Sequence, residues 1–430
     1  MKTTANDRVT AKTTWSLDQW LHYLLAIHPS EIDMGLDRVS RVYQRLGIQF
    51  KRTTVITVAG TNGKGSTCRF IELALQSLGR SVVVYSSPHI SDYRERVRIN
   101  NALPEAQAFC DAFLHIERMR GADSLTYFEF GTLAALLLAY QKAPDYLILE
   151  VGLGGRLDAT NIVDADLAIV SSIDLDHQEY LGTTRESVAF EKAGIFRPDI
   201  PIVIGERDTP HTMLDQAHRL TQKFLRKGID FDSKVNGEGD WDWSCGGQSV
   251  NGLPPPRLLR DNISTALAGL QALGLLESLI TQPRLLHDLV ATATLPGRMQ
   301  VLQKAPLWIA DVGHNPHAAK AIASELTPHL SGQLYIIVGM MKDKSIAETL
   351  QQLQPLSPKW LPATLPGERA ASAETLAGLL NPADVVGHFD SVASAVSAVN
   401  AKVQPHDTVL VFGSFVTVDQ LLTLNRRNTL

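Results

Sequence analysis

A glycine-rich segment, T-V-A-G-T-N-G-K-G-S at residues 57–66, carries the residue types that hold phosphate groups. It follows an apolar, β-branched run and precedes a helical pattern, so its glycines would let backbone N–H groups face an anion at a helix N-terminus. Lys64 would meet the β- and γ-phosphates of a nucleotide, and Ser66 or Thr67 would reach a metal or a phosphate. Gly65 separates Lys64 from Ser66, so the spacing departs from the common pattern G-x-x-x-x-G-K-[ST]. The alternative is a glycine-rich turn with a solvated lysine.

Glu150 and His177 each follow an apolar run that is expected to be a strand. Ligands of parallel α/β sheets bind beyond the carboxyl ends of the strands, so a carboxylate at Glu150 is well placed for Mg²⁺. A helix cap or an ion pair is an equal alternative for that residue. His177 is flanked by Asp174 and Asp176, which makes it a candidate for metal binding or acid/base chemistry.

Spacing alone favours a structural role for two other charged features. Lys192, in F-E-K-A-G-I-F, is expected on a helix surface and paired with Glu191. The segment Tyr93–Arg98, Y-R-E-R-V-R, contains three arginines and is interpreted as a solvated charged loop.

The C-terminal part of the chain again shows a strand, a polar loop and a helix in that order. D-V-G-H-N-P-H at residues 311–317 follows an apolar run, and its Asn-Pro pair indicates a helix start. Asp311 would accept hydrogen bonds from ribose hydroxyls and His314 would contact phosphate or substrate, with a capped turn as the alternative. Arg298, in L-P-G-R-M-Q, lies at an expected domain junction and is a candidate for phosphate binding. F-G-S-F-V-T at residues 412–417 is a further strand-to-helix loop.

Apolar runs that alternate with helical patterns must position these residues. In the first part of the chain, strands are expected at Val55–Val58, Ser81–Tyr85, Tyr146–Val151, Leu167–Ile173 and Pro201–Ile204, and helices at Ser66–Leu78, Phe128–Tyr140 and Glu186–Ala193. In the second part, strands are expected at Leu307–Asp311, Leu334–Gly339, Val385–Phe389 and Thr408–Phe412. Between the two series, Asn236–Gly252 is expected to form short antiparallel strands or a loop.

Strands that alternate with helices form parallel sheets. We therefore predict an α/β protein in which a P-loop parallel-sheet ATPase domain, residues 1–297, precedes a smaller Rossmann-like α/β domain, residues 298–430.

Composition excludes several classes of protein. The chain has 430 residues, of which 44% are apolar and 20% charged, as in folded proteins of two or three domains. A net charge of −5 gives no indication of nucleic-acid binding. The three cysteines lack metal-ligand or disulfide spacing, and neither a signal peptide nor a membrane-spanning run is indicated. We expect a cytoplasmic protein that binds small molecules, without nucleic-acid or membrane partners, and a monomer by default.

Several motifs occur in an order that is typical of one enzyme family. They are I-D-M-G-L-D-R-V at residues 32–39, V-A-G-T-N-G-K-G-S, Y-S-S-P-H, T-Y-F-E-F-G-T-L-A-A-L, L-E-V-G-L-G-G-R-L-D-A-T-N-I-V-D, E-K-A-G-I-F, L-P-G-R and D-V-G-H-N-P-H. Together they resemble the folylpolyglutamate synthase family of the Mur ligase superfamily, and within it the bacterial enzymes that are also dihydrofolate synthases. The resemblance implies an ATP-dependent ligase that adds L-glutamate to dihydropteroate and to reduced folates through an acyl-phosphate intermediate.

The resemblance also implies roles for individual residues. ATP would be bound by Asn62, Gly63, Lys64, Gly65, Ser66, Asn262, Arg298 and Asp311. The pterin or folate would be bound by Ile32, Asp33, Met34, Thr126, Asp158 and Ala159. Two Mg²⁺ ions would be bound by Ser87, Glu150, His177 and a Lys192 carbamylated by CO₂, and a monovalent cation is a further candidate. The implied catalytic residues are Lys64, Lys192, His177 and His314, and the choice between the two histidines for proton transfer stays open.

Two segments depart from the family pattern. Asp343-Lys344-Ser345 stands where the family often has D-K-D, and residues 413–417 read G-S-F-V-T where the family has G-S-F-H-T. Both departures bear on nucleotide or glutamate contacts rather than on the chemistry. The alternatives to the folate reaction are a Mur-type ligase acting on a UDP-sugar peptide, a nucleotide-binding switch without ligation, and an enzyme that acts on folates alone.

Overall fold

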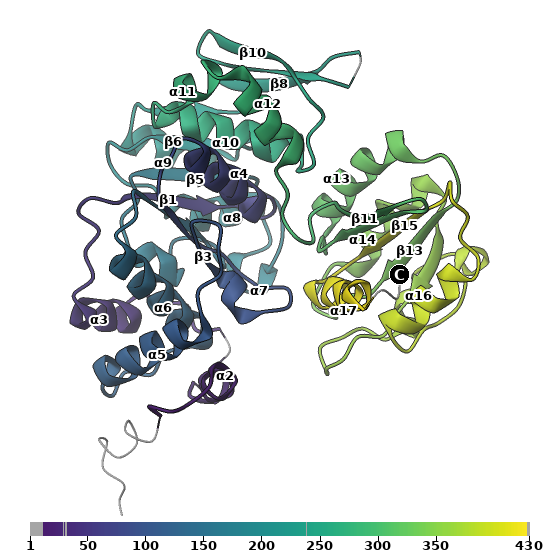
Figure 1. The fold of residues 1–430 in the computed structure, drawn as a ribbon, viewed down its shortest axis with the longest axis horizontal. Coiled ribbons are helices and arrows are strands. Elements are labelled where there is room, and N and C mark those ends of the chain that lie inside the picture. Colours follow the sequence, from purple (N-terminus) through teal and green to yellow (C-terminus); the bar gives the residue numbers. More distant parts are fainter. Residues whose placement is uncertain (1–11, 29, 31, 238, 428–430) are drawn as a thin grey trace, which may run out of the picture. The chain divides into compact units, whose positions relative to one another are not determined.

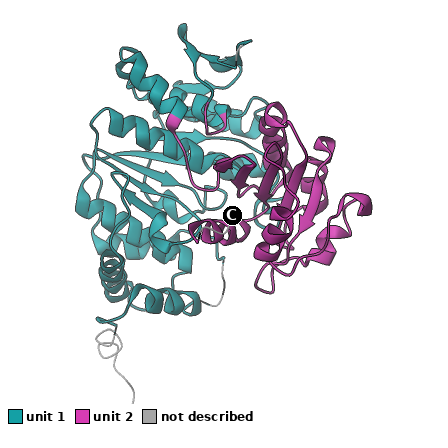
Figure 2. Cartoon of the chain, turned by 45° about the vertical axis from the view of Figure 1, so that its right-hand side comes forward, with its two compact units in different colours: residues 1–255, 260–291 teal, residues 256–259, 292–430 magenta. Residues whose placement is uncertain are grey.

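The computed structural model describes residues 12–28, 30, 32–237 and 239–427. The chain divides into two compact units (Figure 2): unit 1 comprises residues 1–255 and 260–291, and unit 2 comprises residues 256–259 and 292–430. Unit 2 therefore begins a few residues before the domain boundary expected at residue 298. Within the described ranges, no helix is both long and apolar enough to cross a membrane.

A seven-stranded sheet forms the centre of unit 1 (Figure 1), in the order β3-β2-β4-β1-β5-β6-β7. Neighbouring strands are parallel except β3, which runs antiparallel to β2. The strands are β1 (Thr54–Ala59), β2 (Val82–Tyr85), β3 (Val97–Ile99), β4 (Tyr146–Glu150), β5 (Leu167–Val170), β6 (Ile202–Ile204) and β7 (Phe224–Arg226). The strands expected in this part of the sequence are confirmed. The two edge strands, β3 and β7, were not predicted, because each is only a short run without a buried apolar pattern.

Helices cover both faces of this sheet, which explains why its central strands are continuous apolar runs. On one face α4 packs against β1, β2 and β4, and α10 packs against α4, β5 and β6. On the other face α2, α3, α5 and α6 enclose one apolar core, and α8 and α9 enclose a second. The bounds are α2 (Leu17–Ala26), α3 (Asp37–Leu46), α4 (Lys64–Ser77), α5 (Ala106–Arg120), α6 (Tyr127–Lys142), α7 (Gln178–Leu181), α8 (Arg185–Ala193), α9 (His211–Leu220), α10 (Arg260–Ala272), α11 (Leu276–Ile280) and α12 (Pro283–Thr292). The helices expected from the sequence are confirmed as α4, α6 and α8.

The glycine- and tryptophan-rich stretch folds as an antiparallel sheet in the order β10-β9-β8. Its strands are β8 (Phe231–Val235), β9 (Trp241–Cys245) and β10 (Gln248–Leu253). Trp241 and Trp243 alternate along β9 and are both buried, which gives this small sheet one apolar face. The prediction of short antiparallel strands is confirmed.

Unit 2 contains a five-stranded sheet in the order β11-β12-β15-β13-β14, parallel except for the edge strand β11. The strands are β11 (Gln300–Lys304), β12 (Leu307–Asp311), β13 (Leu334–Val338), β14 (Lys359–Pro362) and β15 (Thr408–Phe412). The helices are α13 (Pro316–Leu326), α14 (Ile346–Gln351), α15 (Ala373–Ala377), α16 (Val392–Asn400) and α17 (Phe415–Arg426).

The prediction of a strand at Val385–Phe389 is wrong. This segment touches the sheet only through two isolated bridges, from Val385 to Trp360 and from Phe389 to Ala363. The edge strand is instead β14, whose sequence K-W-L-P ends in proline. A proline is tolerated at the end of an edge strand because its missing N–H removes no bond from the centre of the sheet.

Candidate active site

Two glycines shape the loop between β1 and α4. Gly60 and Gly63 have φ angles of 154° and 83°. A Cβ atom at Gly60 would lie 2.0 Å from the hydroxyl oxygen of Ser171, and one at Gly63 would lie 2.2 Å from Oδ1 of Asn262. No side chain fits at either position, so the loop lies this close to its neighbours only as glycine. Gly63 is also the N-cap residue of α4 and has no side chain with which to cap the helix.

Hydrogen bonds fix this loop to the segment that follows β5. The N–H of Thr61 donates to the Ser172 carbonyl at 2.9 Å, and its hydroxyl donates to the Asp174 carbonyl at 2.8 Å. The Asn62 carbonyl accepts from the hydroxyls of Ser171 at 2.6 Å and Ser172 at 3.0 Å. The sequence reasoning missed these two serines. The available signal was a pair of hydroxyl residues directly after a buried strand.

The first turn of α4 presents the groups expected to bind phosphate. Lys64 begins the helix, and its Nζ donates to the carbonyl oxygens of Gly60 at 2.9 Å and Thr61 at 3.2 Å. The Thr67 hydroxyl is buried and has no hydrogen-bond partner in the part of the chain that the structure describes. A helix N-terminus with a lysine and a buried hydroxyl suits an anionic ligand.

Glu150 ends β4, the strand beside β1, and its register places it opposite Val58. Its side chain is buried. Burial and then the charge of Glu150 raise the pKa of the Cys68 thiol on α4, so the carboxylate lies near this helix. A buried carboxylate at the carboxyl end of a parallel strand is an oxygen donor suited to a divalent cation.

Lys192 is buried, with 3% of its surface exposed, so the surface position favoured by its spacing is wrong. Glu191 pairs instead with Arg156, at 2.9 Å between Oε1 and Nη2. Burial lowers the pKa of the Lys192 amine to about 7, the charge of Lys64 adds to this shift, and Asp176 opposes it. The two lysines therefore lie close enough to repel each other.

The loop after β4 packs against the end of α8 that carries Lys192. The N–H of Arg156 donates to the Glu191 carbonyl at 2.7 Å, and Nδ2 of Asn161 donates to the Arg156 carbonyl at 3.0 Å. The motif G-L-G-G-R-L-D-A-T-N thus joins the strand of Glu150 to the helix of Lys192.

The other residues expected to bind metal lie on loops. His177 is the N-cap residue of α7 and has a left-handed φ of 50°, and Ser87 follows β2. Within the described ranges, no group of three or more His, Cys, Asp or Glu side chains is arranged to hold a metal. The expected set contains only two such side chains, Glu150 and His177. The Ser87 hydroxyl and a carbamate on Lys192 would complete a set of hard oxygen and nitrogen donors that suits Mg²⁺ or Mn²⁺. Their shared role stays a prediction.

The basic segment Tyr93–Arg98 is not a solvated loop, and that interpretation is wrong for two of its arginines. Arg96 is buried and lies over the rings of Tyr93 and Tyr127, 5.3 Å from each ring centroid. Arg98 pairs with Glu72, which is fully buried, at 2.9 Å. Both arginines contact elements distant in sequence, which spacing within the loop does not reveal.

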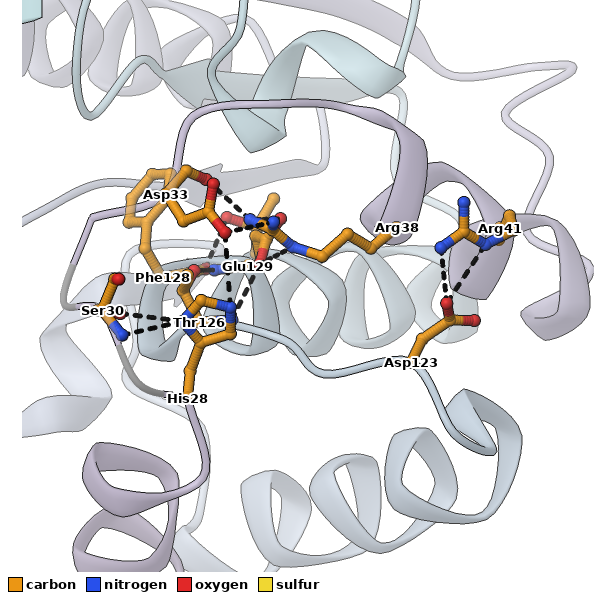
Figure 3. Close-up of polar contacts among 10 residues, drawn as sticks. His28, Ser30, Asp33, Arg38, Arg41, Asp123, Thr126, Phe128 and Glu129 are labelled. Carbon is orange, nitrogen blue, oxygen red and sulfur yellow. Dashed lines mark hydrogen bonds and ion pairs between the residues drawn. The ribbon is translucent and has the colours of Figure 1, made fainter.

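The residues expected to contact folate occur in three segments of unit 1. In the first, Asp33 accepts from Arg38 (Figure 3), Ile32 is exposed, and Met34 packs against the apolar core of β5 and α8. In the second, Thr126 is the N-cap residue of α6, and its hydroxyl oxygen accepts from the Glu129 N–H at 3.1 Å.

The third segment contains Asp158 and Ala159, which are both buried. Oδ2 of Asp158 accepts from the N–H groups of Gly152 at 3.0 Å and Leu153 at 2.9 Å. Oδ1 accepts from the N–H and hydroxyl of Thr160 at 2.9 and 2.6 Å. Burial raises the pKa of Asp158, and these hydrogen bonds oppose the shift. Asp158 therefore organises its own loop, and its contact with a substrate stays a prediction.

In unit 2, Asp311 ends β12 and is buried. Its Oδ2 accepts from the Met299 N–H at 2.8 Å and its Oδ1 from the Gly313 N–H at 2.7 Å. Burial raises the pKa of Asp311, and the nearby Arg298 guanidinium opposes the shift. The Arg298 guanidinium carbon lies 5.2 Å from the Phe415 ring centroid. These contacts bring Arg298 and Asp311 together, and their role in ATP binding stays a prediction.

The loop after Asp311 is held by its own hydrogen bonds. Nδ1 of His314 lies 2.9 Å from the Val312 carbonyl, and Oδ1 of Asn315 accepts from the Ala318 N–H at 2.9 Å. Pro316 occupies the first turn of α13, and the expected helix start at Asn-Pro is confirmed.

The segments that depart from the family pattern both begin helices. Ser414 caps α17 by accepting from the Thr417 N–H at 3.1 Å, and the Thr417 hydroxyl donates to the Gly339 carbonyl at 2.8 Å. Ser345 is the N-cap residue of α14 without a side-chain cap bond. Nothing in these contacts explains Val416.

Comparisons with known proteins agree with this geometry. Residues 58–249 match the family described as Mur ligase middle domain, and residues 297–415 match that described as Mur ligase, glutamate ligase domain. The chain is 46% identical to the dihydrofolate synthase/folylpolyglutamate synthase of Escherichia coli over 94% of both chains. It is 42% identical to the protein of the same name from Haemophilus influenzae, over 95% of this chain and 97% of that one.

The chain belongs to the dihydrofolate synthase/folylpolyglutamate synthase family of Mur ligases. The solved structure of E. coli FolC in complex with DHPP and ADP matches with a TM-score of 0.91 and 44% identity, covering 97% of this chain and 99% of that one. The structure of the bifunctional Yersinia pestis enzyme with Mn, AMPPNP and L-glutamate bound matches with a TM-score of 0.87 and 42% identity, covering 96% and 99%. The predicted family, the α/β fold class and the function of a ligase that joins glutamate to folates are confirmed.

Proposed function

We propose that the chain adds L-glutamate to dihydropteroate, giving dihydrofolate, and to reduced folates, giving folylpolyglutamates, and that each addition converts one ATP to ADP and phosphate. In this proposal residues 1–297 bind ATP and the folate, and residues 298–430 form the ligase domain. Both activities appear in the names of the E. coli and H. influenzae relatives. The similar solved structures contain ADP and DHPP in one case and AMPPNP, Mn and L-glutamate in another.

The first chemical step activates a carboxylate, which is a poor electrophile. The carboxylate of dihydropteroate attacks the γ-phosphorus of ATP. The bond between that phosphorus and the β-phosphate oxygen breaks, ADP departs, and an acyl phosphate is formed. Lys64 and the N–H groups of residues 62–66 bind the phosphates and offset their growing charge. The nucleotide contacts that the resemblance assigns to Asn262, Arg298 and Asp311 belong to the same proposal.

The second step forms the amide bond. The amine of glutamate attacks the acyl carbon, the tetrahedral intermediate collapses, and inorganic phosphate leaves. The amine must lose a proton, and in this proposal His177 or His314 would accept it. The binding segments hold the two reactants in line, which is the main contribution expected of this site.

Ser87, Glu150, His177 and Lys192 would hold two divalent cations, which neutralise phosphate charge when bound. Lys192 would serve as a carbamate: its neutral amine adds to CO₂ and loses a proton, which gives an anionic oxygen donor. The lowered pKa of Lys192 supports this, because only the neutral amine reacts with CO₂. A monovalent cation, a monomeric state and a cytoplasmic location are parts of the proposal that rest on the sequence.

The observation that carries the proposal is that Lys64, at the start of α4, lies near a buried Lys192, whose pKa is lowered by burial and then by the charge of Lys64. The test is ADP release from MgATP with L-glutamate and either dihydropteroate or a reduced folate. Glutamate-dependent release with both acceptors is expected. Release with the reduced folate alone would identify a folate-only enzyme. Release only with a UDP-sugar peptide would identify a Mur-type ligase, and ATP binding without release would identify a switch.

A further inference from the structure

Arg38, near the start of α3, makes contacts on two sides (Figure 3). Its Nη1 donates to Oδ2 of Asp33 at 2.5 Å, and its Nη2 donates to the Asp33 carbonyl at 2.6 Å. On the other side, Nη2 and Nε donate to the two carboxylate oxygens of Glu129 at 3.0 and 3.3 Å. One guanidinium therefore holds both the side chain and the backbone of Asp33 against α6. We call this contact the Arg38–Glu129 brace.

Besides the Arg38 contacts, the segment is held by the packing of Met34 on the apolar core of β5 and α8. The described residues between α2 and α3 belong to no helix or strand, so side-chain contacts fix their position. His28 adds one such contact, with its Nε2 lying 3.5 Å from Oδ2 of Asp33. The Arg38–Glu129 brace joins this segment to α6.

Glu129 connects the brace to a second predicted folate segment. Its side chain is buried, and Oε2 also accepts from the N–H of Thr126 at 2.7 Å. Thr126 caps the same turn of α6 in return. A buried carboxylate requires such partners, because a charge without them is costly in a low-dielectric interior.

The first turn of α6 also reaches the third predicted folate segment, through the backbone at Gly152. A Cβ atom at Gly152 would lie 2.5 Å from Cζ of Phe128, so the Phe128 ring rests on the backbone at Gly152. The Gly152 N–H is in turn bound by Asp158. One helical turn therefore contacts the first two segments that the resemblance assigns to folate binding and reaches the third through the backbone at Gly152.

We infer that Arg38 and Glu129 are positioning residues for the folate acceptor, because their brace fixes the segment of Asp33 to the turn of α6 that meets the other two segments. This inference rests on the proposed function. Without the brace, the segment would become ordered only when the acceptor binds. The entropy lost in this ordering would weaken the binding of the acceptor but not that of ATP.

Arg41 supplies a matched control on the same helix. It pairs with Asp123 at 2.6 Å, just before α6, so its contact also joins α3 to the approach of that helix (Figure 3). No residue assigned to folate binding takes part in that pair. Arg41→Met thus removes a more exposed ion pair of the same helix without touching the brace.

Amide hydrogen exchange in the free protein tests the brace without any substrate. In Arg38→Met, amides of residues 32–36 should exchange about tenfold faster than in the unmodified protein, because local opening no longer breaks the brace. Arg41→Met should leave the exchange of that segment unchanged. Unchanged exchange in Arg38→Met would overturn the inference.

Steady-state kinetics connect the brace to the reaction. Arg38→Met should raise KM for dihydropteroate about tenfold and leave KM for ATP unchanged, as expected for the loss of preorganisation on one side of a site. Arg38→Lys should not restore KM, because an ammonium group cannot replace a planar fork that binds two partners. Glu129→Gln, which keeps the size of the side chain, should act in the same direction and serves if Arg38→Met fails to fold.

An equal rise in both KM values, or the same rise in Arg41→Met, would show a general effect on the fold and contradict the inference. If the unmodified protein releases no ADP with dihydropteroate, the proposed function is wrong. The hydrogen-exchange result still decides in that case whether the brace positions residues 32–36.

Discussion

The loop after β1 in unit 1 and the loop after β12 in unit 2 each join a strand to a helix. They differ in how the first turn of that helix is capped. The N-cap residue of α4 is Gly63, which offers no side chain to the first N–H groups of the helix. The N-cap residue of α13 is Asn315, whose side chain accepts from the Ala318 N–H at 2.9 Å, and Pro316 follows it. The first N–H groups of α4 therefore receive no side-chain cap, whereas one of the first N–H groups of α13 is satisfied by its own N-cap residue.

This difference separates two kinds of site. The start of α4 combines helix N–H groups with the ammonium of Lys64, which is the arrangement of an anion site. The loop before α13 instead carries a buried carboxylate, Asp311, whose pKa is raised by burial. A loop that caps its own helix can hold such side chains in fixed positions, but it offers fewer free N–H groups to a phosphate. The predictions below test this contrast, from the largest expected effect to the smallest.

Lys64→Ala should abolish ligation and leave the fold intact. Without the Lys64 side chain the loop keeps its hydrogen bonds to the segment after β5, whereas the charge of Lys64 is needed where phosphate charge develops. The loss in kcat/KM should be about 1,000-fold or more. Circular dichroism checks the fold, and ADP release checks the reaction.

Lys320→Ala is the matched control, because Lys320 is exposed on α13 and should not matter for the reaction. Substantial ligation by a folded Lys64→Ala variant would contradict the assignment of this loop to phosphate binding. The proposed difference in function between the two loops would then be wrong as well.

Lys192→Ala should also be inactive, and short-chain carboxylic acids should restore part of the activity by replacing the carbamate. The unmodified chain should in addition lose activity as pH falls through about 7, because burial lowers the pKa of the Lys192 amine to about 7. Below that pH the amine is protonated and cannot add to CO₂, and above it the neutral fraction increases.

Rate measurements with and without added bicarbonate, across this pH range, check the carbamylation. A Lys192→Ala variant with normal activity and no response to carboxylic acids would return Lys192 to a structural role. Lys142→Ala, at the end of α6, is a suitable lysine control because Lys142 is exposed.

Gly63→Ala should weaken ATP binding by about 100-fold, the order expected when a binding loop is displaced by an ångström. The new methyl group would lie 2.2 Å from Oδ1 of Asn262, and the φ of 83° is strained for alanine. Isothermal titration with a non-hydrolysable ATP analogue measures the change.

Gly79→Ala is the control for strain alone. Gly79 follows the other end of α4 with a φ of 74°, and a Cβ atom there would meet nothing within 4 Å. If both variants bind ATP equally well, the close contact between Gly63 and Asn262 has no part in nucleotide binding.

Local patterns in the sequence were enough to predict the parts of the site that depend on one element. The phosphate loop and Glu150 each lie at the end of an apolar run, so strand pattern and position predicted where they would be. The central strands were equally readable because they are buried on both faces. The false strand at Val385–Phe389 and the missed β14 lie at a sheet edge, where the apolar pattern is weakest.

Residues whose surroundings come from distant parts of the chain could not be predicted in this way. Lys192 is buried because the loop after β4 packs on α8, and its spacing within α8 says nothing of that loop. Arg96 is buried because Tyr127 of α6 lies beside it. For Lys192 only the family resemblance indicated a role. Arg38 lay within a quoted motif, but its contact with Glu129 required the packing of α3 on α6.

Asn315→Ala should have the smallest effect of these substitutions. It should change the stability of the protein rather than its catalysis. Removing the side-chain cap of α13 should lower the free energy of unfolding by about 1 kcal/mol, the usual cost of losing an N-cap. KM for ATP should change little, because the capped N–H group is already satisfied within the chain. Urea unfolding followed by circular dichroism measures the first quantity, and Ser372→Ala, which removes the cap of α15 in the same unit, gives the reference. A variant with unchanged stability and a raised KM for ATP would mean that the start of α13 also receives an anion, and the two loops would then differ in sequence but not in kind.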